Sequence, residues 1–144
     1  MANMRRSMVK MAAICAAATM MACSGGKKTI DPAQLNGEWS IENVKGEKVT
    51  AEEIPFLGFD VKEQRIYGST GCNLLTGSLP VDSLAQGVID FSAMGSTRKM
   101  CHDMKAEQTI LGALATVEGF SFDKEGNLVL TDGEGKNVML LEKK

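Results

Sequence analysis

The chain has 144 residues, of which 44% are hydrophobic and 24% charged, the composition of an ordinary soluble globular domain. Its 16 Lys and Arg and 18 Asp and Glu give a formal net charge of −2, without the basic excess of a nucleic-acid binder. His102 is the single histidine, which excludes a metal site with several His ligands. The common nucleotide-binding, zinc-protease and hydrolase motifs do not occur in the sequence.

The first 22 residues have the pattern of a secretory signal peptide. Arg5, Arg6 and Lys10 occur without any acidic residue, and the twelve residues 11–22 carry no charge. Twelve residues are too few for a membrane-spanning helix, which needs about 20. A buried amphipathic helix is the alternative, but the run has no polar face. We therefore predict a signal peptide at residues 1–22.

Cys23 follows this segment in a setting that resembles a bacterial lipobox, with Met20 at the position usually held by Leu. We predict that Cys23 is acylated and becomes the first mature residue, which gives stable anchoring because each buried CH₂ contributes about 0.8 kcal/mol. The alternative is simple cleavage after Ala22, with Cys23 an incidental thiol. By resemblance to bacterial lipoproteins, Ser24 after the cysteine favours the outer membrane, and the lack of a following acidic run favours its periplasmic side.

Residues 23–34 are small and polar, and they predict a flexible tether. Without residues 1–22 the chain keeps 13 Lys and Arg against 18 Asp and Glu, a formal net charge of −5. The expected partners are therefore a membrane, through the lipid anchor, and an envelope protein, and not a nucleic acid.

The remaining chain, residues 35–143, predicts one domain of short strands. Apolar alternation and turn residues predict strands over residues 38–44, 57–61, 64–68, 76–81, 87–92, 118–123, 128–131 and 137–142. In the first of these, Trp39, Ile41 and Val44 form the apolar side. Lys62-Glu63 and Asp82-Ser83 are expected turns, and residues 124–127 and 132–135 have strong hairpin signals.

The apolar period changes once, over residues 103–118. Ile110, Leu111, Leu114 and Val117 recur at helical spacing, and Asp103 is the expected N-cap. Many short antiparallel strands and one helix predict an α+β, mainly β fold, in which a small sheet curls over the packed helix.

Two cysteines, Cys72 and Cys101, belong to the predicted domain, because Cys15 leaves with the signal peptide. Two thiols in an exported domain most often pair, so we expect a disulfide. Zinc bound with His102 and Asp103, a Cys–His nucleophile, a redox pair and two free thiols remain alternatives. We predict no catalytic residue, no metal site and no cofactor.

Several segments resemble the META domain, the family of HslJ-like lipoproteins. The motifs are Gly71-Cys72-Asn73 and Thr97-Arg98 with Cys101 three residues later, directly before the expected helix. Residues 35–39, 59–60, 65–68, Gly77 and 128–130 fit the same order, so the resemblance covers residues 35–143. It implies an open lipocalin-like barrel with one packed helix, in a small exported or lipid-anchored protein without established enzymatic activity.

The resemblance makes Asn73, Thr97 and Arg98 the candidate binding residues. Each also has a structural explanation: a turn for Asn73, a strand contact for Thr97, and ion pairing or coverage of apolar surface for Arg98. We expect a non-enzymatic, lipid-anchored envelope protein that acts in envelope stress tolerance or in binding a protein partner. The alternatives are a module that binds small molecules or lipids and, with less support because His102 is the only imidazole, an enzyme.

Overall fold

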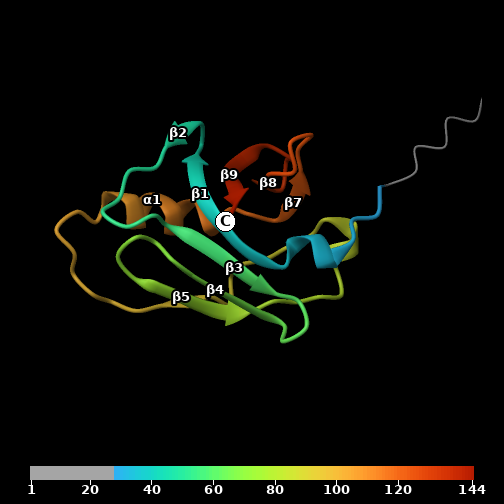
Figure 1. The fold of residues 1–144 in the computed structure, drawn as a ribbon, viewed down its shortest axis with the longest axis horizontal. Coiled ribbons are helices and arrows are strands. Elements are labelled where there is room, and N and C mark those ends of the chain that lie inside the picture. The colour runs from blue at the N-terminus through green and yellow to red at the C-terminus, as the bar shows by residue number, and fades with distance from the viewer. Residues whose placement is uncertain (1–27) are drawn as a thin grey trace, which may run out of the picture.

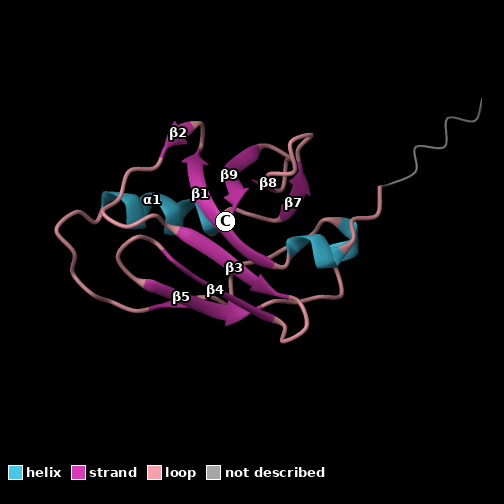
Figure 2. Ribbon diagram, viewed as in Figure 1, coloured by secondary structure: helices cyan, strands magenta, loops and turns pink. Residues whose placement is uncertain are grey.

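The computed structural model describes residues 28–144, in which nine antiparallel strands form one sheet against one α-helix, α1 (Lys105–Leu114) (Figures 1 and 2). The strands are β1 (Gly37–Val44), β2 (Glu47–Lys48), β3 (Phe56–Asp60), β4 (Arg65–Ser69), β5 (Leu74–Ser78), β6 (Gly95–Ser96), β7 (Gly119–Phe122), β8 (Leu128–Thr131) and β9 (Asn137–Lys143). Two 3-10 helices, η1 (Pro32–Leu35) and η2 (Leu84–Gln86), complete the described elements. The predicted signal peptide, residues 1–22, and Cys23 lie outside the described residues.

The strand order is β6-β5-β4-β3-β1-β9-β8-β7, with β2 paired to β1. The sheet is not closed, because the order ends at β6 and β7. The predicted α+β, mainly β class is therefore confirmed at the level of an antiparallel sheet with one helix. Within residues 28–144, no helix combines the length and the apolar character that a membrane crossing requires.

Strand β1 joins the two halves of the sheet. It pairs with β3 over residues 37–40 and with β9 over residues 39–44. A bulge between Ile41 and Asn43 shifts the alternation by one residue, so that Trp39, Ile41 and Val44 are all buried. The bulge explains why three residues with uneven spacing share the inner face, as the sequence predicts.

Two hairpin turns near the C-terminus are built alike. Asp123 Oδ1 accepts hydrogen bonds from the N–H groups of Glu125 and Asn127, and Gly126 has a φ of +88°. Asp132 plays the same part in the next turn, where Gly135 has a φ of +78°. An aspartate that binds the turn backbone and a glycine in the left-handed region are what the sequence signal requires.

The core lies between the curled sheet and α1. Helix residues Ile110, Ala113 and Leu114 are buried in one cluster with the inner face of the sheet. The largest fully buried side chains are Phe59, Leu35, Leu57, Ile66, Leu79, Leu84, Ile89, Ile110, Leu128, Leu130, Met139 and Leu141. Figure 1 shows α1 behind β1 and β3, on one side of the sheet.

The strand predicted over residues 87–92 is wrong. Only Val88 makes an isolated bridge, to Gly119. Gly87 has a φ of +75° after η2, and Asp90 accepts hydrogen bonds from the N–H and hydroxyl of Ser92, so the chain turns instead of extending. Ile89 and Phe91 still enter the core from this irregular segment, which accounts for the apolar pattern.

Strand β5 and the helix also have boundaries other than the predicted ones. Strand β5 begins two residues earlier than the predicted strand over 76–81 and ends before Pro80, which has no N–H to pair. The helix is shorter than residues 103–118: Met104 occupies its N-cap position, although Asp103 Oδ1 accepts the Lys105 N–H at 2.8 Å. Val117 is buried beyond the helix end, where the chain extends into β7.

The ordered fold takes up part of the segment predicted as tether. The Ile30 N–H donates to the Ala85 carbonyl at 3.0 Å, and Ile30 packs against the core. Asp31 caps η1, whose last residue, Leu35, is fully buried. Figure 1 shows this beginning of the described chain at the end of the molecule opposite the loop between β6 and α1.

Candidate functional site

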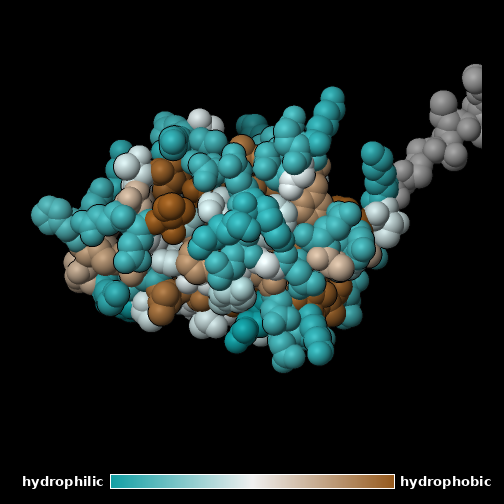
Figure 3. Space-filling model, in the orientation of Figure 1, coloured by the Kyte–Doolittle hydropathy of each residue, from teal (hydrophilic) through white to brown (hydrophobic). Residues whose placement is uncertain are grey.

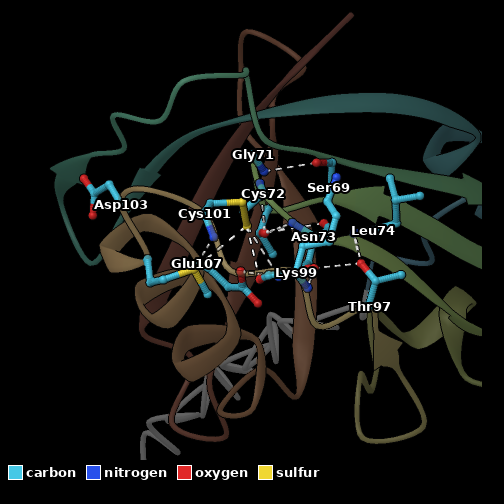
Figure 4. The surroundings of a disulfide bond; sticks show 12 residues. Ser69, Gly71, Cys72, Asn73, Leu74, Thr97, Lys99, Cys101, Asp103 and Glu107 are labelled. Atoms are coloured by element: carbon cyan, nitrogen blue, oxygen red, sulfur yellow. Dashed lines mark hydrogen bonds between the residues drawn. A yellow bond between two sulfur atoms is a disulfide. The ribbon is translucent and has the colours of Figure 1, made fainter.

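A disulfide joins the two domain cysteines. Cys72 lies in the turn between β4 and β5, and Cys101 lies in the loop between β6 and α1 (Figure 4). Their Cα atoms are 6.0 Å apart, within the usual range for a cystine, although 29 positions separate them in sequence. The structure thus contains the predicted pair, and the bonded sulfurs leave no thiolate for a zinc ligand or a nucleophile.

The turn that carries Cys72 depends on its neighbours. Gly71 has a φ of +89°, and a Cβ atom there would lie 2.8 Å from the Glu53 carbonyl oxygen. The Gly71 N–H donates to Ser69 Oγ at 3.0 Å, and the Asn73 N–H donates to Thr70 Oγ1 at 3.0 Å. The glycine of the Gly-Cys-Asn motif is therefore required by backbone conformation and by close approach.

The side chain of Asn73 holds the loop that leads to Cys101. Asn73 has 0% exposure. Its Oδ1 accepts from Thr97 Oγ1 at 2.8 Å and from the Lys99 N–H at 2.6 Å. Its Nδ2 donates to the Lys99 carbonyl at 3.1 Å and to Glu107 Oε2 at 2.7 Å. An amide can make four hydrogen bonds of this kind, so Asn73 has none left for a ligand.

Thr97 is part of the same network. Its hydroxyl donates to Asn73 and accepts from the Leu74 N–H at 3.0 Å, while its own N–H donates to the Leu74 carbonyl at 3.0 Å. We call the disulfide, Asn73, Thr97 and Glu107 together the clasp. The clasp fixes the β6–α1 loop to the β4–β5 turn and to the first turn of α1.

Sequence reasoning did not identify Glu107. This residue is buried, and it anchors the Asn73 amide from the first turn of α1. The available signal was its spacing: Glu107, Ile110 and Leu114 share one helix face, so a carboxylate stands on an otherwise apolar face. Because a carboxylate in such a position needs a donor, the pattern could have indicated a polar partner from the sheet.

Of the three candidate binding residues, Arg98 is not part of the clasp. It is exposed, and within residues 28–144 the structure has a single salt bridge, between Lys144 and Glu38. Lys99 is also exposed, although its backbone is held by Asn73. The structure therefore divides the predicted set: Asn73 and Thr97 hold the loop, whereas Arg98 makes no salt bridge within residues 28–144.

Large apolar side chains are exposed around the clasp. Among residues 28–144, only Ile54, Leu74, Val88 and Met100 are large, hydrophobic and exposed. Three of them lie in segments next to the clasp: Ile54 before β3 at 68% exposure, Leu74 at the start of β5 at 62%, and Met100 beside Cys101 at 88%. Figure 3 shows hydrophobic side chains at the surface of this end, and others near the opposite end of the same face.

A surface hollow of about 320 Å³ lies against the disulfide. Its wall includes both cysteines, Gly71, and the side chains of Asp103 and Glu107. No group of three or more His, Cys, Asp or Glu residues in the part of the chain that the structure describes could hold a metal ion. The carboxylates here serve the helix start and the clasp.

Two comparisons with known proteins, by family model and by structure, found a match. The family model described as "META domain" matches residues 28–144. An NMR structure of a protein from Burkholderia xenovorans is similar with a TM-score of 0.55 and 19% sequence identity, over 81% of this chain and 90% of that chain. At this identity the likeness shows a shared fold. A search of curated proteins gave no match.

Proposed function

Because this chain belongs to the META domain family, we propose that it is a lipid-anchored envelope protein that acts by binding a protein partner rather than by catalysis. The family suggests an envelope-associated, non-enzymatic protein. Our proposal adds acylation at Cys23, attachment to the outer membrane on its periplasmic side, and a part in envelope stress tolerance.

One observation carries the partner-binding proposal: three of the four large apolar side chains exposed among residues 28–144 lie in segments next to the clasp. Single exposed apolar residues are normal on a protein surface, but their concentration at one end is typical of an interaction site. Most other large apolar residues are buried in the core. The exposure of Ile54, Leu74 and Met100 is therefore not a general property of the apolar residues of this fold.

The arrangement of the two ends agrees with this proposal. The described chain begins at the end opposite the β6–α1 loop (Figure 1), and the proposed anchor precedes it in sequence. An anchor there would direct the clasp away from the lipid surface, toward other envelope components. We further propose that the sheet is a lipocalin-like open barrel whose inner side holds α1, since Ile110 and Leu114 are buried against it.

Lipidation is tested by intact mass of the protein isolated from bacterial envelopes. We expect a mature product that begins at Cys23 and carries acyl groups, in the outer-membrane fraction. Cys23→Ser should move the protein to the soluble fraction, while Ser24→Ala, the matched neighbour, should not. An unprocessed chain or a membrane-bound Cys23→Ser variant would refute the anchor.

The stress function is tested by deletion of the protein and complementation. We expect cells without it to lose survival under detergent or heat stress, and wild type but not Cys23→Ser to restore survival. Equal survival of the deletion strain under several envelope stresses would remove this part of the proposal.

A further inference from the structure

We infer that Arg98, Lys99 and Met100, here called the tip, form a preformed contact for an acidic segment of a protein partner. This inference rests on the proposed partner-binding function and names the surface and the chemistry of that partner. The cations of Arg98 and Lys99 would contact the carboxylates, and Met100 would pack against a neighbouring apolar side chain.

The tip is held on both sides by the clasp. Before it, Thr97 is bound to Leu74 through main chain and hydroxyl. Within it, the Lys99 N–H and carbonyl both bind the Asn73 amide. After it, Cys101 is fixed by the disulfide. A loop held at three successive points loses little conformational entropy when it binds, and such preorganisation favours affinity.

The fold does not need the side chains at the tip. The groups that hold the loop are the Thr97 hydroxyl, the Lys99 backbone and the Cys101 sulfur, whereas Arg98 and Lys99 are exposed. Met100, at 88%, is the most exposed large apolar side chain in the described part of the chain. Methionine adapts its shape to many apolar surfaces, which suits it to a contact position.

Charge indicates an acidic partner. Without residues 1–22 the chain has a formal net charge of −5, yet Arg98 and Lys99 lie together without an ion-pair partner among residues 28–144. Three carboxylates, Glu52, Asp103 and Glu107, line the hollow beside the disulfide, but none of them forms a salt bridge with Arg98 or Lys99 among residues 28–144. An acidic segment would be repelled by most of this protein and attracted at the tip, which orients the encounter and selects one docking site.

The same features disfavour a membrane as the occupant. Recognition of anionic lipids through charge usually relies on clusters of about 4–8 Lys or Arg. The tip has two cations, and Lys105 adds a third nearby. The tip is also at the end opposite the beginning of the described chain (Figure 1). A protein segment can combine two ion pairs with one apolar contact, which suits a surface of this size.

The test is photo-crosslinking in living cells, with the full chain and its lipid anchor. A photo-reactive phenylalanine analogue replaces Met100 in one strain and, as a control, Lys62 in the exposed β3–β4 turn in another. We expect position 100 to give a protein adduct whose crosslinked peptide, sequenced by mass spectrometry, is rich in Asp and Glu. Alkylation of free thiols verifies that Cys72 and Cys101 stay bonded.

Charge dependence is then measured at the same position. Arg98→Ser with Lys99→Ser should lower the yield of the adduct at least tenfold, while Lys124→Ser with Lys136→Ser, a matched loss of two exposed cations in other turns, should leave it unchanged. Leu74→Ser should lower the yield less, since Leu74 borders the tip through Thr97.

The outcomes separate this inference from the function on which it rests. A phospholipid adduct at position 100, a peptide without acidic residues, or a yield unaffected by the double substitution would overturn the acidic-segment contact. Protein adducts from position 62 but none from position 100 would refute the tip and leave partner binding intact. No protein adduct from any exposed position, with Ile54 and Leu74 included in the scan, would refute partner binding itself.

Discussion

At the scale of single residues, Asn73 is the most constrained polar side chain of the described structure. Asn73→Ala would leave the buried Glu107 carboxylate without its Asn73 donor, and the partly buried hydrogen bonds to the Lys99 backbone and the Thr97 hydroxyl would be lost. An unsatisfied buried group costs about 1–3 kcal/mol, and more when it is charged. We therefore expect a loss of about 3 kcal/mol in the free energy of unfolding.

Urea denaturation of Asn73→Ala and Asn73→Asp measures this effect. Asn73→Asp should be at least as harmful, since it places a second carboxylate where Nδ2 now lies 2.7 Å from Glu107. Thr76→Ala, an exposed position on the neighbouring β5, is the control and should change stability by less than about 0.5 kcal/mol. Equal stability of Asn73→Ala and the control would contradict a structural role for the Asn73 amide.

Asp123 gives the turn between β7 and β8 a dependence on pH. Desolvation raises the pKa of this carboxyl, but hydrogen bonds from Asn127, Glu125 and Gly126 outweigh it and hold the pKa below its usual value. A lowered folded pKa stabilises the native state above the unfolded pKa, near pH 4, and this contribution is lost as the pH falls through the folded value.

Asp123→Asn should therefore lower the melting temperature at neutral pH, and its difference from wild type should shrink as the pH falls below about 4. Thermal unfolding at pH 7 and at pH 3 measures the two differences. Asp82→Asn, at an exposed turn position, is the matched control and should give no such convergence. A constant difference across pH would contradict the role of the carboxylate charge.

At the scale of elements, the disulfide links a sheet turn to the loop before α1. It closes a loop of 29 positions, for which the chain-entropy treatment gives about 3.5 kcal/mol. Replacing both Cys72 and Cys101 by Ala should cost about this amount, yet the hydrogen bonds of the clasp should keep the fold. Reductant should lower the melting temperature of wild type and not of the double variant, and an equal response of both would contradict a structural disulfide.

Gly58 in β3 and Gly68 in β4 each lack space for a side chain, but different atoms of the paired strand occupy that space. A Cβ atom at Gly58 would meet the ring of Tyr67, which is a side chain, whereas one at Gly68 would meet the main-chain carbonyl of Phe56. Gly58→Ala should lower the free energy of unfolding by about 2 kcal/mol in the wild-type background. In the Tyr67→Ala background the same substitution should lower it by less than about 1 kcal/mol.

Gly68→Ala has no comparable rescue, because no side-chain truncation removes a carbonyl oxygen. Adding Phe56→Ala should therefore leave its cost unchanged, which gives the matched comparison in the same pair of strands. Denaturant unfolding of the two double-mutant cycles measures both couplings. A rescue of Gly68→Ala by Phe56→Ala would contradict the contact with the main chain.

The strands with regular alternation and turn signals could be predicted from sequence. The β7–β8–β9 meander is the clearest case, since Asp123 and Asp132 each precede a glycine by three residues in turns of the same design. Residues 87–92 have a strand-like pattern without forming a strand. Ile89 and Phe91 have the spacing of a strand, but Gly87 and Asp90 turn the backbone. The alternation of apolar residues contains no information about that turn.

The site could be predicted in part. The pairing of Cys72 with Cys101 follows from two thiols in an exported domain, and Asn73 and Thr97 stand out as polar residues in motifs. Their direct contact does not follow, because it depends on how the β6–α1 loop returns to β5 across more than 20 residues. Tertiary contacts of that kind leave no periodic signal in a single sequence.

At the scale of the whole molecule, β1 connects two half-sheets, of which one carries the clasp. Strands β3 to β6 carry the clasp and the apolar residues around it, and β7 to β9 complete the core on the other side. Since β1 pairs with both β3 and β9, it joins the two halves within the sheet, while α1 and the core contact both of them. We infer that the sheet mainly provides rigid support for the clasp.

The lipid anchor should fix the orientation of the molecule on its membrane. An anchor at Cys23 and a described chain that begins opposite the β6–α1 loop should keep residue 28 close to the lipid headgroups and residue 100 remote from them. A fluorescent amino acid at either position, in lipidated protein reconstituted into vesicles with nitroxide-labelled headgroups, reports this proximity. We expect strong quenching at position 28 and little at position 100, with the Cys23→Ser protein unquenched at both. Stronger quenching at position 100 would mean that the clasp faces the anchoring membrane, and a partner in the periplasm would then have to bind another surface.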